Sequence, residues 1–137
     1  DFLVQRARNY IYSTAMPSAI AVASLKSLEI VKSESWRREK LQDNIKYFHE
    51  HLYQLNGLQD NSPTIISTSM TAIQPIILGC ADRTSLLSQK LESNGILVSA
   101  IRPPTVPQQT SRLRITLNTM HSFQDIDRLF DVLGENL

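Results

Sequence analysis

The chain has 137 residues, of which 42% are hydrophobic and 20% are charged, and its formal net charge is +1. This composition is typical of one globular domain, and the small net charge excludes a broad field that would attract nucleic acid or an anionic membrane. The single cysteine, Cys80, excludes an internal disulfide and favours a reducing, cytoplasmic compartment, and no apolar run is long enough to cross a membrane.

Three helices are predicted in the first 57 residues. The chain starts at Asp1, without Met, inside a segment that is typical of a helix (2–11), so we expect a piece of a longer protein. Pro17 suits the first turn of the next helix, over 18–33. The third helix carries one apolar stripe with steps of 4, 3, 4 and 3 residues and is followed by Gly57 as a C-cap: Leu41, Ile45, Phe48, Leu52 and Leu55. We expect this stripe to pack on the domain's own sheet, because it is too short for a stable coiled coil.

The second half of the chain alternates strands and helices. After a turn-like segment over 57–64, the pattern predicts a strand over 71–79, a helix over 82–95, strands over 96–101 and 111–117, and a last helix that begins with a capping-box pattern at Ser122 and Asp125. Pro75 places the first strand at a sheet edge or a bulge. Leu86, Leu87 and Leu91 should point inward from the helix that Asn94 and Gly95 close. The order predicts an α+β fold, a small sheet of about three strands covered by helices.

The sequence does not support a metal site, a nucleophilic cysteine or a glycine-rich phosphate-binding loop. His49 and His51 are two residues apart on a helix and cannot chelate one ion together, and His121 stands alone, so we expect no metal site. Cys80 has no positioned base beside it and is expected in the core or at its boundary. The four glycines are dispersed, which excludes the usual phosphate-binding loop.

The stretch "AIRPPTVPQQTSRLRI" (100–115) combines three prolines with three arginines. The prolines fix their own φ angles, so Arg102 and Thr105 should be held with little freedom. In the strand that follows, Arg112, Arg114 and Thr116 should share the face opposite the core, and Leu113, Ile115 and Leu117 should point into the core. A planar guanidinium on a rigid frame suits bidentate binding of a carboxylate, although a solvated arginine face fits the same pattern.

Four segments together resemble a known family. "YIYSTAMPSA", "SWRREKL", "SMTAIQPIILG" and "AIRPPTVP…TSRLRITL", followed by "HSFQDIDRL", occur in the order found in the C-terminal region of the 8-amino-7-oxononanoate synthases, which are α-oxoamine synthases of the fold-type I aminotransferase superfamily. The resemblance covers essentially the whole chain. Related glycine acetyltransferases and aminolevulinate synthases usually read "YPVVP" or "YPTVP" where this chain has "RPPTVP". Gln109 stands where the family usually has glycine, and Ser18 where it often has proline.

The resemblance implies an activity and a set of site residues. Such enzymes use pyridoxal 5'-phosphate (PLP) to condense L-alanine with a pimeloyl thioester, on coenzyme A or acyl-carrier protein, with loss of carbon dioxide, in biotin biosynthesis. By this resemblance Arg114 binds the alanine carboxylate, and Arg102 and Thr105 contact substrate. Ser13 and Thr14 would reach the cofactor phosphate of the neighbouring subunit in a homodimer.

None of the five lysines of this chain lies in the glycine-rich context of the family's cofactor-binding lysine. We therefore expect residues 1–137 to be the C-terminal small domain with its connecting helix, without the large PLP-lysine domain and without a catalytic residue of its own. The isolated chain should not bind PLP covalently or turn over substrate. Two alternatives stay open at this point: another α-oxoamine synthase of the glycine C-acetyltransferase type, or an interaction module that kept only this domain.

Overall fold

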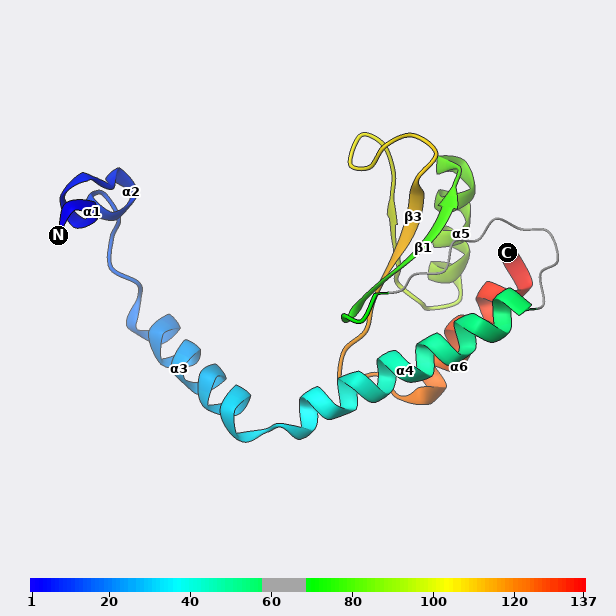
Figure 1. Ribbon diagram of the computed structural model, residues 1–137, viewed down its shortest axis with the longest axis horizontal. Helices are drawn as coiled ribbons and strands as arrows, with labels where there is room; N and C mark the ends of the chain where they lie inside the picture. The colour runs from blue at the N-terminus through cyan, green and yellow to red at the C-terminus, as the bar shows by residue number, and fades with distance from the viewer. Residues whose placement is uncertain (58–68) are drawn as a thin grey trace. The chain divides into compact units, whose positions relative to one another are not determined.

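The computed structural model describes residues 1–57 and 69–137 (Figure 1), and the turn predicted over 57–64 lies, apart from Gly57, outside them. The chain divides into two compact units, 1–35 and 36–137, each of which is described by itself. No helix within the described residues is both long and apolar enough to cross a membrane.

The unit of residues 1–35 consists of helices α1 (Phe2–Arg6), α2 (Arg8–Ile11) and α3 (Ser18–Ser33). The single helix predicted over 2–11 is wrong, because Ala7 has an extended backbone (ψ 100°) that separates α1 from α2. Pro17 directly precedes α3 instead of lying in its first turn, and its ψ of 137° is likewise extended. No side chain of this unit is buried, so the unit has no core of its own.

The unit of residues 36–137 contains α4 (Trp36–Gly57), β1 (Ile73–Gly79), α5 (Ala81–Ser93), β2 (Ser99–Ile101), β3 (Ser111–Thr116) and α6 (Phe123–Asn136). Its three strands form an antiparallel sheet in the order β1-β3-β2, with α5 packed along one face (Figure 1). The predicted α+β architecture is confirmed. Pro75 lies in an edge strand, which confirms one of the two readings of this proline. It pairs in register with Arg114, and the register shift of β1 falls further along, between Ile77 and Gly79.

The apolar stripe of α4 supplies much of the core. Ile45, Phe48 and Leu52 are at most 1% exposed. Their helix packs along α6 (Figure 1), and the stripe belongs to one core cluster with Leu113 and Ile115 of the sheet. The rings of Phe48 and Phe130 lie 5.0 Å apart. Leu91 is fully buried and Leu87 nearly so, whereas Leu86 is 66% exposed, so the prediction that Leu86 points inward is wrong. The reason is helix geometry: residues four apart share a face, and adjacent residues do not.

Both predicted helix ends are confirmed. The Ser122 hydroxyl accepts a hydrogen bond from the Asp125 N–H (3.2 Å), and the Asp125 carboxylate accepts one from the Ser122 N–H (2.8 Å), which is a complete capping box. These hydrogen bonds hold the pKa of the Asp125 carboxyl below its usual value. At the end of α5, Gly95 has φ +77°, and the N–H groups of Gly95 and Ile96 close the helix on the carbonyls of Glu92 and Leu91.

Candidate functional site

Strand β3 has one buried face and one open face, as its alternation predicts. Leu113, Ile115 and Leu117 are at most 4% exposed. Across the sheet, Arg114 lies between Pro75 and Ser99, and Arg112 lies between Ile77 and Ile101. The open face of the sheet is therefore formed by Ile73, Pro75, Ile77, Ser99, Ile101, Arg112, Arg114 and Thr116.

The two arginines of this face differ. The Arg114 side chain is exposed, and neither Arg114 nor Arg102 forms an ion pair or a side-chain hydrogen bond with any described residue. Arg112 is half-buried, and its Nε donates a hydrogen bond to the carbonyl of Thr110 (2.9 Å). The N–H donors of Arg114 are therefore available to an anion from outside the described chain, whereas one donor of Arg112 is already bonded to Thr110.

The proline-rich bend over 102–110 joins two paired strands. Because β2 and β3 are antiparallel neighbours, the bend begins and ends at the same end of the sheet. The exposed Arg102 and Thr105 thus lie at the end of the sheet where Arg112 pairs with Ile101, and Arg114 lies two residues further along β3, opposite Ser99. The N–H of Thr105 donates to the carbonyl of Arg102 (3.0 Å), which closes the first turn of the bend.

Gln109 adopts a conformation that favours glycine. Its φ is +64°, and it is the one residue other than glycine with a positive φ in the described chain. The family that the sequence resembles usually has glycine at this position. Left-handed backbone geometry costs a residue with a Cβ about 1 kcal/mol.

Ser13 and Thr14, the predicted phosphate ligands, lie in the unit of residues 1–35. Both side chains are exposed. The structure describes this unit by itself, so the contact with a neighbouring subunit's cofactor stays a prediction.

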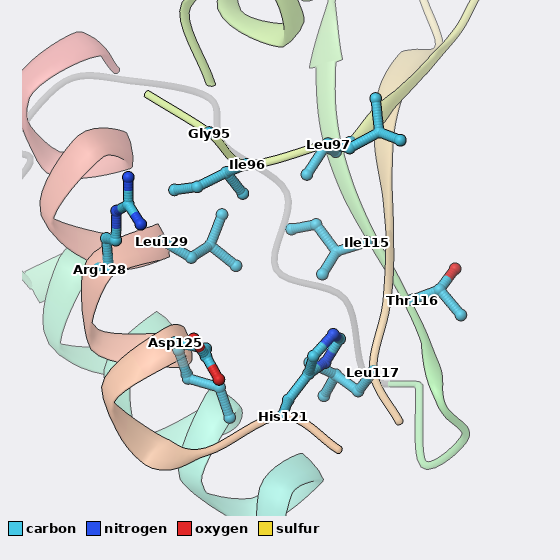
Figure 2. Close-up of a pocket in the computed structure, with 12 residues that line it drawn as sticks. Gly95, Ile96, Leu97, Ile115, Thr116, Leu117, His121, Asp125, Arg128 and Leu129 are labelled. Carbon is cyan, nitrogen blue, oxygen red and sulfur yellow. The ribbon is translucent and has the colours of Figure 1, made fainter. Parts of the chain in front are cut away.

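A hollow of about 330 Å³ lies between residues 95–98, the end of β3 and α6 (Figure 2). Its floor is apolar, with Ile115 from the strand and Leu129 from the helix. Its polar rim groups already have partners within the domain. Asp125 belongs to the capping box, Arg128 donates to the carbonyl of Asn94, and the His121 ring accepts from the N–H of Asn118. We therefore place the candidate site on the open sheet face and not in this hollow.

The histidines of α4 bond to other groups of the domain, and the cysteine is exposed. His49 lies 3.0 Å from the carbonyl of Ser69, and His51 contacts the carbonyl of Tyr47 and the Asp127 carboxylate, each at 3.1 Å. Within residues 1–57 and 69–137, no group of three or more potential ligands could hold a metal ion. Cys80 is exposed at the N-cap of α5, so its predicted place in or beside the core is wrong.

Asn44 supports the region without having been predicted. It is completely buried in α4, and its Nδ2 donates to the carbonyls of Asn118 and His121, both at 3.0 Å. These two bonds fix the loop that leads from β3 to α6. The sequence contained one signal of this role, because Asn44 directly precedes Ile45 of the apolar stripe of α4.

Comparison with known proteins shows the family of the chain. The family model described as aminotransferase class I and II matches residues 1–133. The chain belongs to this family. Its relatives include 8-amino-7-oxononanoate synthase of Nitrosococcus oceani, 50% identical over all 137 residues, and that of Pseudomonas syringae pv. tomato, 49% identical over 135 residues. The chain spans about a third of the length of these relatives, 34% and 32%.

Solved structures show the same fold. A crystal structure of 8-amino-7-oxononanoate synthase from Francisella tularensis matches 98% of this chain and 37% of its own with a TM-score of 0.78 and 33% identity. Serine palmitoyltransferase of Sphingomonas wittichii matches 98% of this chain and 32% of its own with a TM-score of 0.83, and at 20% identity this likeness concerns the fold alone.

Proposed function

We propose that residues 1–137 are the C-terminal small domain, with its connecting helix, of a PLP-dependent acyltransferase. The enzyme condenses L-alanine with a pimeloyl thioester, on coenzyme A or acyl-carrier protein, to 8-amino-7-oxononanoate and carbon dioxide in biotin biosynthesis. The observation that carries the proposal is the exposed Arg114 on the open face of β3, which has no partner among residues 1–57 and 69–137, in a chain 50% identical to a synthase of that name.

In this proposal Arg114 binds the carboxylate of alanine. Its guanidinium presents parallel N–H donors that match the two carboxylate oxygens. The side chain extends from the central strand of the sheet, whose backbone is bonded on both sides, so its point of attachment is fixed. No described carboxylate competes for them. A bidentate contact in a partly desolvated site contributes about 2–4 kcal/mol, against under about 1 kcal/mol for an exposed pair.

Arg102 and Thr105 serve the acyl partner. They lie at the end of the sheet in a bend that three prolines stiffen, so little conformational freedom is lost when substrate binds. A guanidinium and a hydroxyl at this place donate hydrogen bonds to oxygens of the thioester substrate.

The cofactor fits this chain only in part. When bound, PLP acts as an electron sink for the carbanion that alanine forms. None of the five lysines belongs to the open sheet face, so the lysine that holds PLP is expected in the part of the relatives that this chain does not match. The exposed hydroxyls of Ser13 and Thr14 suit a phosphate group of a neighbouring subunit, which implies a homodimer, and we place the enzyme in the cytoplasm.

The test uses the full-length protein. We expect a visible absorbance band of bound PLP, removed by borohydride, and turnover that requires both L-alanine and pimeloyl-CoA. Preference for glycine with acetyl-CoA would instead support the glycine C-acetyltransferase alternative. Absence of PLP binding would support the interaction module and contradict the proposal.

A further inference from the structure

Arg112 sits where the sheet meets the proline-rich bend. It is half-buried on β3, and its cross-strand neighbours are Ile77 and Ile101, both half-buried as well. Its Nε donates a hydrogen bond of 2.9 Å to the carbonyl of Thr110, the last residue of the bend. The Arg112 side chain therefore reaches back along the chain instead of only outward like that of Arg114.

Thr110 is in turn the organising residue of the returning half of the bend. Its N–H (3.3 Å) and its hydroxyl (2.8 Å) both donate to the carbonyl of Pro107. Gln109, between them, has the positive φ that a residue with a Cβ resists. The chain of contacts from Pro107 through Thr110 to Arg112 thus holds a segment whose backbone has an unfavourable conformation.

We propose that Arg112 is a positioning residue for this site. It acts through the Thr110 carbonyl to hold the bend that carries Arg102 and Thr105, and it does not bind the amino-acid carboxylate. The inference rests on the proposed function for the meaning of those two residues. The alternative is that Arg112 contributes its positive charge to an anion site beside Arg114.

Two substitutions separate a hydrogen bond from a charge. In Arg112→Gln an N–H donor remains on the atom bonded to Cδ, as in arginine, but the charge is lost. In Arg112→Lys the charge remains, but a methylene group occupies the place of Nε. In the full-length enzyme we expect kcat to stay within about threefold of wild type in the Gln variant and to fall about tenfold in the Lys variant. The KM for alanine should change less than about twofold in both.

A double-mutant cycle shows which residues Arg112 acts through. Combined with Arg102→Ala, Arg112→Leu should add little further loss of kcat, because the bend has already lost the group that Arg112 places. Combined with Arg114→Ala, its effects should add. Lys rescuing better than Gln, a rise in alanine KM like that of Arg114→Ala, or losses that simply follow the melting temperature would each overturn the inference.

Amide hydrogen exchange tests the same inference without turnover. The N–H groups of Thr105 and Thr110 are bonded within the bend, so we expect them to exchange at least about tenfold faster in Arg112→Leu and Arg112→Lys than in wild type and Arg112→Gln. Equal exchange in all four proteins would contradict a positioning role. An inactive wild type with this exchange pattern would contradict the proposed function and leave the positioning role supported.

Discussion

The two faces of β3 come from alternate residues of one strand, yet they differ in burial and in polarity. On one face Leu113, Ile115 and Leu117 are buried against the helices. On the other, Arg112 lies between the half-buried Ile77 and Ile101, and Arg114 is exposed and has no partner in the described chain. One face therefore stabilises the fold, and the other is available to a ligand. Substitutions on the two faces should therefore affect different measurements.

The largest effect on stability is expected on the buried face. Leu113 is 0% exposed, so Leu113→Ala should lower the free energy of unfolding by about 2–5 kcal/mol through lost burial and the remaining cavity. Thr116→Ala, on the open face of the same strand, is the matched control and should change it by less than about 0.5 kcal/mol. Chemical denaturation measures both. Similar losses in the two variants would mean that the faces do not divide as described.

The buried amide of Asn44 in α4 donates hydrogen bonds to the loop that follows β3. Asn44→Leu keeps the branched shape of the side chain but leaves the carbonyls of Asn118 and His121 without their donor, at a cost of about 1–3 kcal/mol. Gln42→Leu, two residues earlier on the exposed side of α4, should cost little. An Asn44 variant as stable as wild type would show that these bonds contribute nothing net.

A smaller effect is expected in the bend beside the open face. Gln109→Gly relieves the positive φ, worth about 1 kcal/mol, and adds freedom to the unfolded chain, so we expect a net gain of about 0.5 kcal/mol. Gln108→Gly, at its neighbour, has no such strain to relieve and should destabilise. Thermal unfolding of the two variants compares them, and a loss of stability in Gln109→Gly would contradict the assigned backbone conformation.

The smallest effect concerns acid. The pKa of Asp125 lies below its usual value of 3.8, because the Ser122 N–H and hydroxyl donate to its carboxylate. A lowered folded-state pKa adds stability above 3.8 that disappears as the pH falls through the folded value. The difference in unfolding free energy between wild type and Asp125→Ala should therefore be constant at neutral pH and shrink below pH 3.8. A difference that grows on acidification would contradict the capping box.

Patterns that depend on neighbours in the chain predicted the structure well. Alternation in "SRLRITL" gave both faces of β3, and the signals at Ser122 and Gly95 gave helix ends. Some errors are local, namely the missed break of the helix at Ala7 and the assignment of Leu86 to the buried face of α5, whereas others concern which distant segment a residue meets. Neither the contact of α4 with α6 nor the bonds of Asn44 to the loop 118–121 leave a periodic trace in the sequence.

The same limit applies to the candidate site. Alternation placed Arg112 and Arg114 on one face but could not distinguish them, because residues two apart in a strand are equivalent by pattern. The structure distinguishes them through the bond from Arg112 to Thr110. That bond runs backward along the chain and depends on the bend, whose shape the prolines restrict but do not determine.

We propose that the open face of the sheet binds the amino-acid carboxylate through Arg114. Steady-state kinetics of the full-length enzyme, with Arg114→Ala and Arg112→Gln at matched folding stability by thermal melts, tests it most directly. Loss of about 2–4 kcal/mol of binding should raise the KM for alanine roughly 30-fold or more in Arg114→Ala. The same KM should stay within about twofold of wild type in Arg112→Gln. A near-normal alanine KM in Arg114→Ala would contradict the account and return the open face to a solvated arginine surface.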